Sequence, residues 1–145
     1  MSPQVRHTPT VITYRVAEAA EILAVSDDTV RRWVEAGRLP SQRSEGRTTV
    51  AGTDLAELAE QLVTSGELAE RDRTHANAVS ARNRMSGIVT RVKRDAVMAQ
   101  VEMICGPYRV VSLMSSDAAD ELSLEPGVRA IASVKSTNVV VEVPR

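Results

Sequence analysis

The clearest pattern of apolar and polar positions lies in residues 26–40, SDDTVRRWVEAGRLP. Val30, Trp33 and Val34 are spaced three and four residues apart, which places them on one face of an α-helix and leaves the arginines on the other. Ser26 is a good N-cap, and a glycine and a proline follow where a helix would end. The pattern therefore predicts a short helix with an apolar seam and a basic outer side.

A second helical pattern precedes this one in residues 16–24, VAEAAEILA. Its small and aliphatic residues recur at helical spacing, and its glutamates lie outside that face. The turn between the two helices is short, which is typical of a helix-turn-helix. An ordinary helical hairpin with solvated arginines is the alternative interpretation of these residues.

The next residues, 41–50 (SQRSEGRTTV), predict a tight β-hairpin with Glu45-Gly46 at its turn. Arg43 and Arg47 flank the tip, so the hairpin forms a basic wing that can reach DNA backbone beside a recognition helix. Thr53 is expected to cap a third helix, whose leucines repeat at helical spacing in DLAELAEQLV.

Residues 14–63 resemble the winged helix-turn-helix of the MerR and excisionase-type DNA-binding families. The resemblance is carried by YRVAEAAEILAVSDDTVRRWVEAGRLP and the arginine-flanked hairpin, although the wing SEGRTT is shorter than is common there. It implies binding to double-stranded DNA. The residues expected to make that interface are Ser26, Thr29, Arg31, Arg32, Arg43 and Arg47.

The second half of the chain changes to alternating apolar and polar positions, a β-strand pattern. Five short strands are predicted, over residues 87–93, 97–104, 108–114, 128–135 and 139–143. A small helix is expected over residues 116–122, before the break at Pro126-Gly127. Five strands with one short helix in so few residues are typical of a small OB-like barrel.

These patterns divide the chain into two domains of α+β class. We expect a loose arm over residues 1–13, a winged helix-turn-helix domain over 14–65, a charged linker over 66–79 that can be helical, and a barrel over 80–145. The net charge is only -1, but residues 31–47 hold five arginines against two acids. That patch suits a polyanion such as DNA.

Three absences in the sequence narrow the function further. A single cysteine and no apolar run long enough for a bilayer predict a cytoplasmic protein without a membrane partner. No grouping of His, Cys or carboxylates suits acid-base or nucleophilic chemistry, so we expect no catalytic residues and no enzyme. The spacing of these residues suggests no metal site either.

Polar side chains gather at both ends of the predicted barrel. Such hydroxyl, amide, guanidinium and ammonium groups are the donors that a tetrahedral oxyanion requires. Plain surface residues are the more frequent alternative for such groups at strand ends. The candidates are Ser80, Ala81, Arg82 and Asn83 at its start, Ser112 and Ser115 within it, and Lys135, Ser136 and Thr137 before its last strand.

Residues 80–143 are similar, over nearly their whole length, to the Mop domain of molybdate-binding, TOBE-like proteins. The matching motifs are SARN, the S-x-x-S pair, the S-x-x-x-x-E-L-x-L-x-x-G stretch and KST. The resemblance implies that molybdate or tungstate binds between Mop domains, at the nine residues just named. Arg94-Asp95 replaces the usual turn glycine, and Val111 replaces a frequent threonine.

Both resemblances together imply a transcriptional regulator that senses molybdate or tungstate. The oxyanion would lie between barrels of different subunits of a homo-oligomer, a dimer or a hexamer, and would modulate operator binding. One alternative is a molybdate storage or buffering protein. The other is a DNA-binding protein whose barrel only oligomerises.

Overall fold

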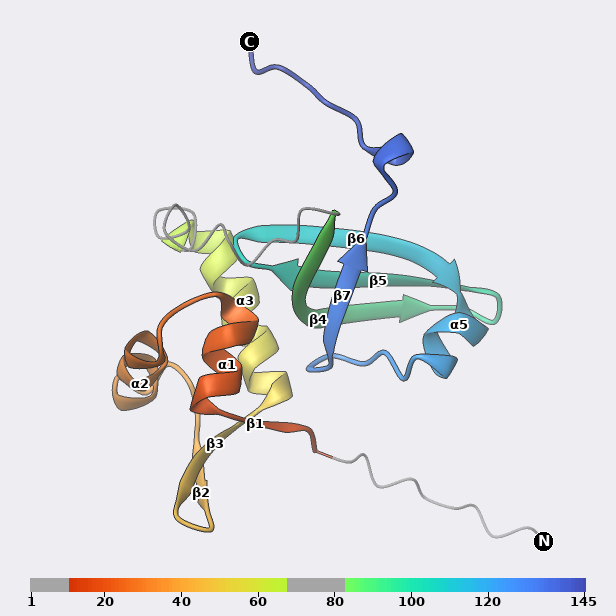
Figure 1. The fold of residues 1–145 in the computed structure, drawn as a ribbon. Helices are drawn as coiled ribbons and strands as arrows, with labels where there is room; N and C mark the ends of the chain where they lie inside the picture. Colours follow the sequence, from red (N-terminus) through yellow and green to blue (C-terminus); the bar gives the residue numbers. More distant parts are fainter. Residues whose placement is uncertain (1–10, 68–82) are drawn as a thin grey trace, which may run out of the picture.

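The computed structural model describes residues 11–67 and 83–145 (Figure 1). Its N-terminal half contains a three-stranded antiparallel sheet of order β1-β3-β2. The first two helices are joined by a short turn, and the third begins directly after the last strand of the sheet. In chain order the elements are β1 (Thr13–Arg15), α1 (Val16–Leu23), α2 (Asp27–Glu35), β2 (Gln42–Ser44), β3 (Arg47–Ala51) and α3 (Gly52–Ser65).

The two helices of the predicted helix-turn-helix are both present. Ala24 ends α1 in the left-handed conformation, with φ of 55°, and Ser26 then caps α2 as expected. Gly37 has φ of 74° after the end of α2, as its position predicted. Within the part of the chain that the structure describes, no helix is long and apolar enough to cross a membrane.

The third helix begins earlier than predicted. Its N-cap is Ala51 and not Thr53, which lies inside the first turn. The reason is the sheet: Ala51 is the last residue of β3 paired with β1, and the N–H of Gly52 donates to the carbonyl of Ile12 at 2.7 Å. The chain therefore turns into the helix directly from the strand.

The hairpin expected over residues 41–50 is formed by β2 and β3. Glu45 and Gly46 have φ values of 53° and 78°. Two consecutive residues with positive φ make a tight turn whose twist matches that of the strands it joins. Arg43 pairs with Thr48 and Ser44 with Arg47, so the register fixes both arginines close to the tip.

The C-terminal half is a four-stranded antiparallel sheet of order β6-β5-β4-β7. An irregularity in the pairing between Val89 and Arg91 lets β4 bend, so that it pairs with β5 and also with β7. The elements are β4 (Arg84–Arg94), β5 (Met98–Cys105), β6 (Tyr108–Ser115), α5 (Ser116–Glu121), β7 (Arg129–Ser133) and the 3-10 turn η3 (Ser136–Asn138).

The prediction of a fifth strand over Val139–Val143 is wrong for the chain taken alone. These residues follow η3 and are assigned to no strand. The turn sends them away from the sheet, so within the described residues they pair with no strand (Figure 1). Four of the five predicted strands are present, and the barrel stays open between β6 and β7.

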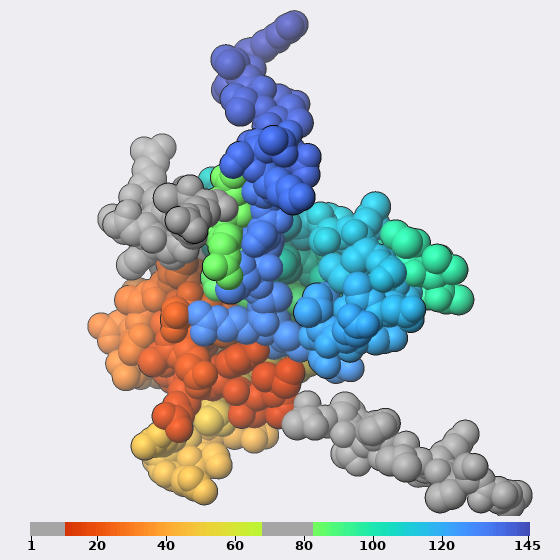
Figure 2. Space-filling view, turned by 45° about the vertical axis from the view of Figure 1, so that its right-hand side comes forward, coloured from red at the N-terminus to blue at the C-terminus, as the bar shows by residue number. Residues whose placement is uncertain are grey.

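The two halves share one hydrophobic core. Ile88 of β4 and Ile104 of β5 are fully buried in the same cluster as the leucines of α1 and α3. The hydroxyl of Tyr14 donates to the carbonyl of Gly127 at 2.8 Å and accepts from the N–H of Arg129 at 3.0 Å. Figure 2 shows the two halves in direct contact.

This contact depends on glycine. A Cβ on Gly127 would lie 2.7 Å from the backbone of Gly52 and Thr53, and φ at Gly127 is +96°. We expect Gly127→Ala to lower the free energy of unfolding by at least about 2 kcal/mol, measured by urea denaturation, because it combines backbone strain with a clash.

The matched control is Gly37→Ala, since Gly37 also has positive φ but nothing within 4 Å of an added Cβ. That variant should lose only the strain, about 1 kcal/mol. Equal losses in the two variants would show that the contact between the halves does not matter for stability.

Candidate functional site

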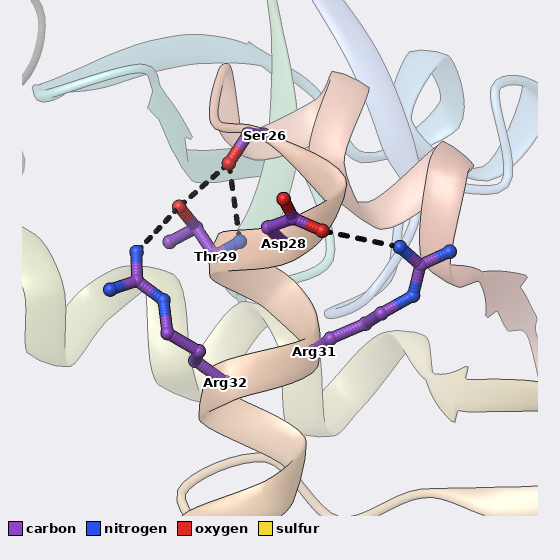
Figure 3. Close-up of polar contacts among 5 residues, drawn as sticks. All are labelled: Ser26, Asp28, Thr29, Arg31 and Arg32. Carbon is purple, nitrogen blue, oxygen red and sulfur yellow. Dashed lines mark hydrogen bonds and ion pairs between the residues drawn. The ribbon is translucent and has the colours of Figure 1, made fainter.

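The N-terminus of α2 is held by a small network of hydroxyls (Figure 3). Ser26 Oγ accepts from the N–H of Thr29 at 3.2 Å and lies 2.9 Å from the Thr29 hydroxyl. Arg32 Nη2 donates to the same Thr29 hydroxyl at 3.4 Å. The cap, the threonine and the arginine therefore orient one another.

The structure corrects the expected orientation of Thr29. Thr29 was expected to contribute to the DNA interface and hence to face outward, but the residue is only 7% exposed. The reason is that its hydroxyl turns back to complete the cap with Ser26. Thr29 therefore exposes little surface to a partner. Its hydroxyl instead accepts a hydrogen bond from Arg32 and so orients that side chain.

Arg31 and Arg32 leave α2 on different sides (Figure 3). Arg31 forms an ion pair with Asp28 at 3.4 Å, and the two side chains are 59% and 88% exposed. Such a pair contributes little to stability because water screens it. Both guanidinium groups are thus presented to solvent with geometry set by the first turn of the helix.

Acidic side chains lie at the N-terminus of α2 and make that end of the helix unfavourable for an anion. Asp27 and Asp28 occupy its first turn, where the positive end of the helix dipole stabilises their carboxylates. Their charges would repel a phosphate at the helix N-terminus, a position that otherwise attracts anions. The basic surface of α2 is therefore formed by its arginine side chains, and Arg43 and Arg47 are exposed on the hairpin.

Arg38 of the basic patch has a partner that is distant along the chain. The two terminal nitrogens of Arg38 donate to the carboxylate of Glu67, at 3.0 and 3.2 Å. This bidentate pair ties the residues after α2 to those that follow the end of α3. Arg38 was counted in the patch by sequence, and only the tertiary structure reveals that it is engaged.

The two ends of the predicted oxyanion site meet through the pairing of β4 with β7. Arg84 lies opposite Ser133, and the N–H of Val134 donates to the carbonyl of Asn83 at 2.9 Å. Asn83 Nδ2 then donates to Ser136 Oγ at 3.4 Å. Lys135 and Thr137 flank Ser136 and are exposed, so amide, hydroxyl and ammonium donors gather at η3.

The donor set at η3 fits an anion better than a metal ion. Amide N–H, hydroxyl and ammonium groups all donate hydrogen bonds to oxyanions. Three of the predicted residues, Ser80, Ala81 and Arg82, lie outside the described residues. Asn83 is the residue of the SARN motif that lies in the described part of the chain, and its φ is 56°.

The two serines on β6 have different surroundings. Ser112 lines a groove of about 410 Å³ together with Ser133 of β7. Ser115 instead caps α5, where its hydroxyl accepts from the N–H of Ala118 at 3.1 Å. Ser133 was not among the predicted site residues.

Cys105 has the properties of a core residue. It is 4% exposed, and burial raises the pKa of its thiol to about 11. A thiol with such a pKa is almost fully protonated at neutral pH and is a poor nucleophile. Among residues 11–67 and 83–145, no three His, Cys, Asp or Glu side chains are grouped to hold a metal.

Comparisons with protein families match both halves. Residues 13–63 match the helix-turn-helix domain family, and residues 79–141 match the TOBE domain family. Molybdenum-pterin-binding protein 2 of Clostridium pasteurianum is 37% identical over 65 residues, which are 44% of this chain and 96% of that protein. Molybdenum transport protein ModE of Herbaspirillum seropedicae is 39% identical over 62 residues, 42% of this chain and 23% of that protein.

A solved structure matches the same half. MopII from Clostridium pasteurianum, in a structure titled apo2, is 36% identical and covers 45% of this chain and 98% of that chain, with a TM-score of 0.41. By sequence alone, the similarity between the C-terminal half and molybdenum-pterin-binding protein 2 extends over nearly the entire length of that protein.

The cap of α2 can be tested alone. We expect Ser26→Ala to lower the free energy of unfolding by about 1 kcal/mol, measured by urea denaturation, because the N–H of Thr29 loses its side-chain acceptor. Ser41→Ala, an exposed serine outside any helix, should change it by less than about 0.5 kcal/mol. If both variants are as stable as the unmodified protein, the hydroxyl network does not hold the helix.

Proposed function

Because this chain belongs to the TOBE-domain family that includes molybdenum-pterin-binding proteins, and carries a helix-turn-helix domain before it, we propose that it is a molybdate-responsive DNA-binding regulator. The observation that carries the proposal is the presence of both domains in one chain. Both families consist of binding domains, so the chain is not an enzyme.

The DNA-binding half would act through α2 and the hairpin. In this proposal α2 lies in the major groove of double-stranded DNA, with Arg31 and Arg32 directed at phosphates or guanine edges. Arg43 and Arg47 on the hairpin contact the backbone beside it. Ser26 and Thr29 hold the helix and Arg32 in place, which the hydroxyl network supports. One such unit reads few base pairs, so a dimer on a two-fold operator is expected.

The oxyanion would bind at η3, between barrels of different subunits. The SARN residues 80–83 and Lys135, Ser136 and Thr137 supply hydrogen bonds and positive charge, and the contact of Asn83 with Ser136 supports this grouping. Ser112 lies in the adjoining groove. Ser115 belongs to the proposed set through its motif, with its hydroxyl shared with the α5 cap. Tungstate, which has nearly the same size and charge, is expected to bind as molybdate does.

Regulation would follow from the shared core of the two halves. A ligand shifts an equilibrium only by its different affinity for the two states. Since Tyr14 and Gly127 join the halves within one subunit, the states that differ are arrangements of subunits. Oxyanion binding would thereby set the spacing of the two α2 helices. The divisions at residues 14–65, 66–79 and 80–145 and a cytoplasmic location belong to the same proposal.

The first experiment tests the DNA interface. We expect Arg32→Ala to weaken binding by about tenfold and to reduce the salt slope by about one, because one phosphate or base contact is lost. The measurement is fluorescence anisotropy on a duplex that the unmodified protein selects from a random pool. Arg91→Ala, which removes an exposed arginine from β4, is the control and should bind normally. Unchanged affinity and slope in Arg32→Ala would contradict the DNA face.

The second experiment tests the oxyanion site by calorimetric titration with molybdate, tungstate and sulfate. We expect Lys135→Ala to bind molybdate at least about tenfold more weakly, because the positive charge that offsets the desolvated dianion is gone. Lys93→Ala, on the exposed end of β4, is the matched control. Full affinity in Lys135→Ala would contradict the site. Binding of molybdate without any selected DNA sequence would instead favour a storage protein.

A further inference from the structure

Arg15 occupies a position that does not suit an arginine. It is the N-cap of α1, and its side chain makes no capping hydrogen bond. A guanidinium group has no acceptor to offer the free N–H groups of a first helical turn. Its positive charge is also unfavourable at the positive end of the helix dipole. Local helix chemistry therefore gives no reason for an arginine here, and residues that conflict with their local structure are typical of functional sites.

The start of α1 is stabilised by a different side chain. Glu18 Oε1 accepts from the N–H of Arg15 at 3.1 Å. A glutamate three residues after an N-cap commonly reaches back in this way. The guanidinium group of Arg15 is exposed and has neither a hydrogen bond nor an ion pair among residues 11–67 and 83–145. It is therefore available to a partner of opposite charge.

The register of the small sheet places Arg15 on the same face as one arginine of the hairpin. Arg15 lies opposite Thr49 of β3, and Thr49 lies opposite Gln42 of β2. Alternation along β3 puts Arg47, two residues before Thr49, on this face as well. Diagonal neighbours on adjacent strands are about 7–8 Å apart, so two long arginine side chains can reach the same stretch of a polyanion.

This face of the sheet is the outer one. Tyr14 and Val50, which lie on the other face, are only 8% and 1% exposed and belong to the hydrophobic core. Among the strand residues of the outer face there are two positive charges and no acid; these residues are Thr13, Arg15, Gln42, Ser44, Arg47, Thr49 and Ala51. The outer face thus suits an anionic partner.

The position of α1 connects this outer face with the recognition helix. α1 contacts both α2 and β3. In Figure 1 the start of α1 lies between α2 and the β2–β3 hairpin. The N-cap of α1 therefore lies between the arginines of α2 and Arg47.

We propose that Arg15 binds a phosphate of the DNA backbone and, together with Arg47, forms a row of phosphate contacts beside α2. This inference rests on the proposed function, to which it adds a residue that neither the helix nor the hairpin contains. Guanidinium groups donate strong hydrogen bonds to phosphate oxygens. Phosphate contacts set the orientation of a protein on the duplex and carry no sequence information. Arg15 thus orients α2 on the DNA and reads no base.

The test compares Arg15→Ser with the unmodified protein. Serine is a preferred N-cap, so the midpoint of urea unfolding should stay the same or rise. DNA affinity should nevertheless fall by about tenfold and its salt slope should decrease by about one, because a phosphate contact is lost. Fluorescence anisotropy at several salt concentrations measures both. The relative loss should be equal on the selected duplex and on an unrelated one.

Two further variants isolate the charge of Arg15. Arg15→Lys should restore most of the salt slope, because it returns the positive charge. Arg91→Ala removes an exposed arginine from β4 and should bind DNA normally. Unchanged affinity and slope in Arg15→Ser would overturn the inference, and so would a loss that appears only on the selected duplex or together with a lower unfolding midpoint.

The inference and the proposed function can be told apart by the same measurement. If Arg32→Ala binds DNA weakly while Arg15→Ser binds normally, the DNA face on α2 stands and only the role of Arg15 is overturned. An unmodified protein that selects no duplex from the random pool would contradict both.

Discussion

The hydroxyl of Tyr14 lies where the two halves of the chain meet, and the rest of the structure depends on that contact. It donates to the Gly127 carbonyl and accepts from the N–H of Arg129, and burial raises its pKa above the ordinary value for a tyrosine. Gly52 and Gly127 approach so closely that neither leaves room for a side chain. A buried, doubly bonded hydroxyl in an apolar contact fixes orientation, because losing either partner leaves a buried polar group unpaired.

Ion pairs surround this contact but contribute less to it. Arg129 pairs with Glu21, and Arg109 with Glu60, each joining the helical half to the sheet. All four side chains are more than a third exposed, so water screens their attraction. The apolar core shared through Ile88 and Ile104 supplies most of the stabilisation, since burial of apolar area is the dominant favourable term. The ion pairs mainly add specificity to the docking.

This arrangement limits how the candidate sites can communicate. The α2 helix and the η3 turn lie at different ends of the subunit (Figure 1). The two halves of the chain are packed on one core, which includes residues of α1, α2, α3, β4 and β5. Rearrangement of subunits is then the simplest route, because α2 moves as a rigid part of its own subunit.

What the sequence determined about this protein is the set of features that depend on near neighbours. The Ser26 cap, the Glu45-Gly46 turn and the four paired strands of the sheet follow from local side-chain chemistry and periodicity, which the residues themselves carry. The meeting of Asn83 with Ser136 was also predictable, because it follows from strand ends that the pattern marks.

The tertiary structure alone decided the burial of Thr29, the early start of α3 at Gly52, the pairing of Arg38 with Glu67 and the unpaired state of Val139–Val143. Each of these depends on a contact, or on the lack of one, with residues distant along the chain. Periodicity identifies a segment that can form a strand, but whether it does so depends on which edge lies within its reach.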